Sequence, residues 1–168
     1  ENLLNWVLNQ KEALEPKIDA LNLNNLLKKT FLELESQSEA KGLSIKTAGL
    51  SEQITLQADE SMLNLVIRNI CSNAIKFSKQ GSEIIITYQL TKDIHLISIK
   101  DFGLGMSKEE AKRLMGLEKH ASSMGTSNEK GTGLGIALSI DFLKAMQGSL
   151  EIKSQVGQGT EVLIKLPK

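Results

Sequence analysis

Apolar residues recur at helical spacing in some segments of this chain and alternate with polar residues in others, and the order of these segments limits its possible folds. Helical spacing predicts helices over residues 21–41, 59–78, 107–115 and 132–146. Alternation predicts strands over residues 43–47, 53–57, 83–90, 94–100, 149–154 and 160–166. This order favours an α+β fold, with a mixed sheet covered on one face by helices.

The composition is that of one globular domain with a short appendage, because 168 residues with 40% apolar residues can bury a core of their own. The 20 Lys and Arg balance the 20 Asp and Glu, so no net field attracts nucleic acid or an anionic membrane. Cys71 is the only cysteine, which excludes a disulfide framework and a cysteine-clustered zinc site and fits a reducing compartment. No apolar run is long enough to predict a membrane span.

The first residues have a pattern of their own. Residues 1–15 carry apolar residues at helical spacing until Pro16 disfavours further helix. We interpret residues 1–15 as the C-terminal end of a longer helix, residues 16–22 as a linker and residues 23–168 as the main domain. The alternative is that residues 1–15 form an ordinary first helix of the core.

Seven of the thirteen glycines gather in three short clusters: Gly103 and Gly105, then Gly131, Gly133 and Gly135, then Gly157 and Gly159. The middle cluster opens the helix predicted from residue 132. Glycines before a helix expose unpaired backbone amides and the positive end of the helix dipole, which together bind anions such as phosphate. A flexible linker into a helix would give the same pattern.

Three other phosphate motifs do not fit. The chain has no Gly-Lys dipeptide, which excludes a P-loop. Residues 124–130, before the middle glycines, are polar, whereas a dinucleotide fingerprint follows a strand. Asp101-Phe102-Gly103 spells the protein-kinase magnesium tripeptide, but no His-Arg-Asp catalytic loop precedes it, so we interpret this match as chance.

Two polar features indicate which ligand the glycine clusters could bind. Asp101 ends a predicted strand beside glycines, where a carboxylate can accept a hydrogen bond from the exocyclic amine of adenine. Asn69, Asn73 and Lys76 lie at i, i+4 and i+7 on one edge of the predicted helix 59–78. Two amides and an ammonium there could hold hydrated Mg²⁺ and triphosphate oxygens. A strand-closing turn and a solvated helix edge are the alternatives for these two features.

These motifs occur in the order of a known family. NICSNAIKFS (residues 69–78), DFGLGM (101–106), GTGLGIAL (131–138) and Gly157-Gln158-Gly159-Thr160 resemble the GHKL ATP-binding superfamily, and within it the catalytic domain of bacterial sensor histidine kinases. The resemblance implies a Bergerat fold, a two-layer α/β sandwich with a mobile ATP lid. The opening ENLLNWVLNQ is similar to the end of the second helix of that family's dimerisation and phosphoacceptor domain.

The resemblance also implies roles for the helix residues and the first glycine cluster. Asn73 would ligate Mg²⁺, with Asn69 beside the ion and the γ-phosphate. Lys76 would contact phosphates and Phe77 would lie near the base. Asp101 would bind the adenine amine, helped through water by Thr160. Gly103 and Gly105 would make room for the base.

The resemblance also implies roles for the middle glycine cluster and for the lid. By the resemblance, amides for the phosphates would come from Gly131, Thr132, Gly133, Leu134 and Gly135, with Lys130 as a candidate lid contact. A solvated loop lysine is the alternative at position 130.

The resemblance implies a protein-histidine kinase that uses ATP and Mg²⁺. Hydrolytic relatives carry a carboxylate at the position matching Asn69 to activate water, and an amide cannot take that proton. Neither His95, in a predicted strand, nor His120, in the predicted lid, fits the family's acceptor motif, so we expect no autophosphorylation by this chain. A clamp-type ATPase and a module that only binds nucleotide are the alternatives.

Expected partners follow from the same resemblance. They are the dimerisation and phosphoacceptor domain of the same protein and, indirectly, a response regulator. Nucleic acid and direct membrane contact are not expected. The expected location is cytoplasmic, with membrane anchoring of the whole sensor left open.

Overall fold

The computed structural model describes residues 15–50, 53–116 and 135–168. The strands are β1 (Asp19–Asn22), β2 (Ser44–Ala48), β3 (Thr55–Ala58), β4 (Glu83–Leu90), β5 (Ile94–Asp101), β6 (Ser149–Gln155) and β7 (Gly159–Pro167). The helices are α2 (Leu23–Ala40), α3 (Glu60–Phe77), α4 (Lys108–Met115) and α5 (Gly135–Ala145). None of the helices in the described ranges combines the length and the apolar character needed to cross a bilayer.

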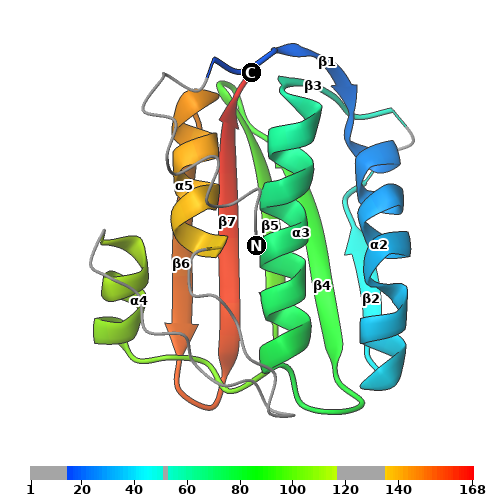
Figure 1. Ribbon diagram of the computed structural model, residues 1–168, viewed down its shortest axis with the longest axis vertical. Helices are drawn as coiled ribbons and strands as arrows, with labels where there is room; N and C mark the ends of the chain where they lie inside the picture. The colour runs from blue at the N-terminus through cyan, green and yellow to red at the C-terminus, as the bar shows by residue number, and fades with distance from the viewer. Residues whose placement is uncertain (1–14, 51–52, 117–134) are drawn as a thin grey trace.

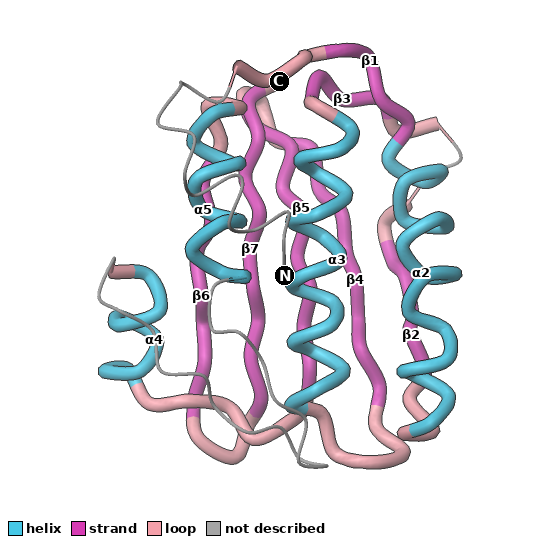
Figure 2. The backbone as a smooth tube through the Cα atoms, in the orientation of Figure 1, coloured by secondary structure: helices cyan, strands magenta, loops and turns pink. Residues whose placement is uncertain are grey.

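Five strands form one mixed sheet in the order β2-β4-β5-β7-β6, and β1 pairs with β3 in a separate two-stranded sheet. β2 runs parallel to β4, and the other neighbours in the large sheet are antiparallel. Helices α2, α3 and α5 cover one face of this sheet (Figures 1 and 2). The structure thus confirms the predicted α+β sandwich.

Helix α3 is central to the core. The Asp59 side chain caps it by accepting a hydrogen bond from the Met62 amide at 2.9 Å. Its buried stripe consists of Leu63, Val66, Ile67, Ile70, Cys71, Ala74 and Ile75. These side chains share one core with isoleucines of β4 and β5. Each buried aliphatic side chain contributes about 1.5–3 kcal/mol, so the position of α3 on the sheet is strongly determined.

The start of α2 differs from the sequence prediction. A helix was expected from residue 21, but residues 19–22 form β1, which pairs antiparallel with β3. Asn22 ends this strand and caps α2, its side-chain oxygen accepting from the Asn25 amide at 2.9 Å. Pairing with a strand more than thirty residues later is a tertiary interaction, which local periodicity does not reveal.

Three segments far apart in sequence meet at one end of the large sheet, the lower end in Figure 1. They are the last turn of α3, the loop that follows β5, and the turn between β6 and β7. The predicted site residues on these segments therefore share one region of the molecule.

Candidate functional site

The polar stripe of α3 lies where the sequence predicted, at the rim of the buried face. Asn69, Asn73 and Lys76 are half-buried, whereas Arg68 on the outer side is exposed. The Asn69 amide nitrogen donates to the carbonyl oxygen of Gly135 at 3.4 Å. This contact joins the stripe to the first turn of α5, whose first residue, Gly135, is the last glycine of the middle cluster.

The loop after β5 lies directly against the last turn of α3. The Leu104 amide donates to the Phe77 carbonyl oxygen at 3.1 Å. A Cβ added to Gly103 would lie 2.0 Å from that same carbonyl oxygen, so no larger residue fits there without moving the loop. The Lys76 ammonium lies 4.7 Å from the centre of the Phe77 ring. Backbone contact therefore fixes the predicted phosphate stripe and the predicted base pocket side by side.

Asp101 is buried at the end of β5, with 5% of its surface exposed. Its Oδ1 accepts from the amides of Gly103 at 2.8 Å and Thr160 at 3.2 Å. In the described part of the chain both of these bonds end on Oδ1, which leaves Oδ2 for a ligand. Burial raises the pKa of Asp101, and the two backbone hydrogen bonds oppose this only in part.

The turn between β6 and β7 closes over Asp101. Gly159 has φ +90°, and a Cβ there would lie 2.1 Å from the Asp101 carbonyl oxygen. Gly105 has φ +61°, and its Cβ would lie 1.9 Å from the carbonyl oxygen of Gln155. Glycine is required at both positions by backbone conformation and by close approach. The role of Gly105 beside the base stays a prediction.

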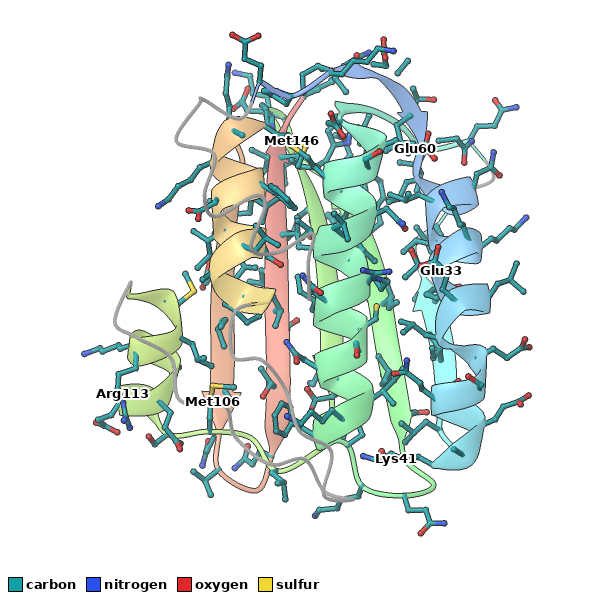
Figure 3. All side chains as sticks on the ribbon, viewed as in Figure 1. Glu33, Lys41, Glu60, Met106, Arg113 and Met146 are labelled. Atoms are coloured by element: carbon teal, nitrogen blue, oxygen red, sulfur yellow. The ribbon has the colours of Figure 1, made fainter. Side chains whose placement is uncertain are left out.

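Sequence reasoning missed Ser154, on β6. Its hydroxyl oxygen accepts a hydrogen bond from the Met106 amide at 2.9 Å and lies 3.0 Å from the Thr160 hydroxyl oxygen. The same hydroxyl donates a hydrogen bond to the Gly159 carbonyl oxygen at 2.9 Å. Figure 3 places Met106 beside the same end of β6. A serine in an alternating strand carries no sequence signal for such a role.

Lys41 was missed as well. It is buried, and its ammonium donates to the carbonyl oxygens of Ile75 at 3.0 Å and Lys76 at 2.7 Å, at the C-terminal end of α3 (Figure 3). A cation at this position satisfies carbonyl groups that the helix leaves open and complements its dipole. Its place before Gly42 indicated only the end of α2.

Other predicted features lie apart from this region or outside the described residues. His95 is a buried β5 residue, as predicted, and its Nδ1 lies 2.8 Å from the Tyr88 hydroxyl. A hollow of about 500 Å³ beside this pair contains none of the predicted site residues. The predicted lid lies outside the described residues, and so do six residues singled out in the sequence: His120, Lys130, Gly131, Thr132, Gly133 and Leu134. Within the described ranges, no group of three or more His, Cys, Asp or Glu residues is arranged to hold a metal.

A family model described as "Histidine kinase-, DNA gyrase B-, and HSP90-like ATPase" matches residues 58–168, well over half of the chain. The chain belongs to this family. The match includes every predicted site residue, and it confirms the resemblance inferred from the motifs. ATP binding by a histidine kinase-like domain is the property on which the family and the residue pattern agree.

One sequence relative and two kinases of known structure show how the chain compares within the family. Sensor protein SrrB of Staphylococcus aureus (strain NCTC 8325 / PS 47) is 28% identical over 166 residues, which cover 99% of this chain and 28% of SrrB. The chain thus spans under a third of the length of this relative. The catalytic domain of histidine kinase ThkA matches with a TM-score of 0.77 and 19% identity, over 90% of this chain and 96% of that domain.

Longer kinase structures have the same fold in this region. Full-length ShkA in complex with AMPPNP matches with a TM-score of 0.80 and 23% identity, over 99% of this chain and 34% of ShkA. ThkA in complex with the response regulator protein TrrA matches with a TM-score of 0.77 and 17% identity, over 99% of this chain and 46% of that kinase chain. The fold is therefore that of histidine kinase catalytic domains.

Proposed function

We propose that this chain is the ATP-binding catalytic domain of a sensor histidine kinase, and that it donates the γ-phosphoryl group of ATP to a histidine on a dimerisation domain. The observation that carries the proposal is the position of Asp101, a buried carboxylate with Oδ2 left for a ligand, next to the helix that holds Asn69, Asn73 and Lys76. One end of the site then suits a base and the other a phosphate chain.

Base recognition rests on an acceptor. An ionised carboxylate can only accept hydrogen bonds, so the free oxygen of Asp101 complements the exocyclic amine of adenine. Guanine and hypoxanthine have a carbonyl oxygen in place of that amine, and two acceptors repel each other. This argument favours ATP over GTP as the phosphate donor.

The metal and phosphates would lie along α3. Mg²⁺ prefers oxygen ligands and keeps several of its waters, so it needs few ligands from the protein. A helix edge that carries two amides can supply them. The Asn69 nitrogen faces the Gly135 carbonyl, so its amide oxygen is the atom left for a cation or a water. We propose that Asn73 holds Mg²⁺, and that Lys76 and the backbone amides of residues 131–135 hold phosphate oxygens. When bound, Mg²⁺ would neutralise charge on the phosphates.

The chemical step needs little from this chain beyond alignment. A neutral imidazole nitrogen attacks the γ-phosphorus, the bond to the ADP oxygen breaks, and the imidazole gives up its proton. Asn69 offers an amide where activation of water would need a base, so the site favours transfer over hydrolysis. His95 is unsuited as acceptor, because it is buried in the sheet and bonded to Tyr88.

Partners and location belong to the proposal. The acceptor histidine would be on the dimerisation and phosphoacceptor domain of the same protein, and the phosphoryl group would pass from there to a response regulator. ThkA, bound to TrrA, supports that pairing by analogy. We propose that the domain acts in the cytoplasm, where ATP is available, whether or not the whole sensor is anchored in a membrane.

Calorimetric titration of the chain with ATP, with and without Mg²⁺, tests the proposal. We expect one site per chain, strengthened by Mg²⁺, and loss of most of that strengthening in Asn73→Ala. Ser72→Ala, one position along the same helix, is the matched control and should bind as the wild type does. Absence of ATP binding would contradict the proposal. Binding with rapid hydrolysis would favour the clamp-type ATPase.

A further inference from the structure

We propose that Ser154 sets the adenine preference of the site by fixing the direction of the Thr160 hydroxyl hydrogen. The inference rests on the proposed function, because it concerns how the same site selects its base. Ser154 is half-buried on β6 and would itself touch no nucleotide atom, so it is a positioning residue acting through Thr160.

The argument starts from the contacts of one oxygen atom. Ser154 Oγ lies 2.9 Å from the Met106 amide nitrogen, 2.9 Å from the Gly159 carbonyl oxygen and 3.0 Å from Thr160 Oγ1. A serine hydroxyl has one hydrogen to donate and two lone pairs to accept with. Three contacts therefore use its full capacity.

The partners decide which way each hydrogen points. An amide nitrogen can only donate and a carbonyl oxygen can only accept, so Ser154 accepts from Met106 and gives its hydrogen to Gly159. The contact with Thr160 must then use the threonine hydrogen. The reverse arrangement would leave two oxygens 2.9 Å apart with no hydrogen between them, which is repulsive. One arrangement satisfies all three contacts.

This arrangement makes the polar wall of the site acceptor-only. Thr160 Oγ1, with its hydrogen committed to Ser154, offers lone pairs alone, and the Asp101 carboxylate also only accepts. Thr160 is tied to Asp101 through its backbone amide, so the two acceptors belong to one wall. Such a wall suits an amine, reached directly or through a water, and disfavours the carbonyl oxygen that hypoxanthine carries at the same place.

The test compares ADP with inosine 5′-diphosphate, which differ in this group, by calorimetry with Mg²⁺. The wild type should prefer ADP. In Ser154→Ala the Thr160 hydroxyl can turn and donate toward the carbonyl, so the ratio of the two dissociation constants should fall about three- to tenfold. Ser154→Thr keeps a hydroxyl, so its ratio of dissociation constants should equal that of the wild type. An equal loss of both nucleotides would mean that Ser154 is only structural, and would overturn the inference.

Thr160→Val provides an independent arm and covers a Ser154→Ala variant that fails to fold. It keeps the backbone bond to Asp101 and removes the acceptor, so ADP should weaken more than inosine diphosphate. Equal weakening would overturn the inference. When Ser154→Ala is added to Thr160→Val, the ratio of the two dissociation constants should not change further. A further change in that ratio would also contradict the inference. Wild-type protein that binds neither nucleotide would refute the proposed function itself, whereas ADP binding with an unmoved ratio refutes only this inference.

Discussion

The Phe77 carbonyl oxygen accepts the Leu104 amide at 3.1 Å, and this bond joins the end of α3 to the loop after β5. A Cβ at Gly103 would lie 2.0 Å from the same oxygen. Gly103→Ala should therefore open this junction, lower the free energy of unfolding by about 1–3 kcal/mol and weaken ATP binding. Urea unfolding and calorimetry would measure the two effects.

Gly116→Ala is the control for that variant. Gly116 has φ −92°, which alanine adopts readily, and among the described residues its added Cβ would meet only the Lys112 carbonyl oxygen, at 3.2 Å. Its effects on unfolding and on ATP binding should be small. If Gly103→Ala behaves like Gly116→Ala, the close contact with Phe77 does not constrain the site.

Asp101→Asn should separate stability from binding. The amide oxygen can still accept from Gly103 and Thr160, while the buried charge is removed, so the melting temperature should not fall. ADP affinity should drop by about 1–3 kcal/mol, because a charged acceptor for the adenine amine is lost. Thermal melts and calorimetry on the same preparation check both directions. Unchanged affinity would remove Asp101 from the site.

The pH dependence of binding follows from the same residue. Burial raises the pKa of Asp101 above its ordinary 3.8, so the carboxylate protonates at a higher pH than a solvated aspartate would. ADP affinity should fall as pH falls through the folded-state pKa, since the protonated acid is a poorer acceptor. Stability has the opposite sign: the folded state binds this proton more tightly, so this group adds stability as pH falls.

The difference between wild type and Asp101→Asn isolates this effect, because titration of the nucleotide phosphates is common to both proteins. The two affinities should converge toward low pH. A difference that stays constant as pH is lowered would contradict the assignment.

The sequence predicted most of the fold because its two periodicities are strong and its interruptions clear. Asp59 and the apolar stripe behind it predicted α3 almost to the residue. The error at β1 has a physical cause: residues 19–22 are extended only because they pair with β3, and nothing within those four residues requires it.

From the sequence we predicted residues that would face the nucleotide, which stays a prediction, and we missed two residues whose hydrogen bonds hold the surrounding backbone. Glycines at Gly103 and Gly105 are visible in sequence because clusters of glycine are unusual, and the structure gives each a steric reason. Ser154 and Lys41 act through hydrogen bonds to backbone atoms of distant segments. These hydrogen-bond partners come together only in the folded chain, so a single serine or lysine in the sequence does not predict them.

Cys71 offers a test of the core that is independent of nucleotide. It has no exposed surface, and burial raises the pKa of its thiol to about 12. At pH 8 iodoacetamide should label the native protein only as fast as it unfolds, and the urea-unfolded protein at the rate of an ordinary thiol. Mass spectrometry reads this directly, because the chain has one cysteine. Rapid native labelling would contradict the burial of this face of α3.

The most direct test of the account mixes this chain with the separately prepared dimerisation and phosphoacceptor domain of its own protein, Mg²⁺ and ATP labelled at the γ-phosphate. We predict acid-labile label on a histidine of the added domain, none on this chain, and loss of transfer with Asn73→Ala. Label released only as free phosphate, or nucleotide bound with no transfer to that histidine, would contradict the assignment as a histidine kinase catalytic domain.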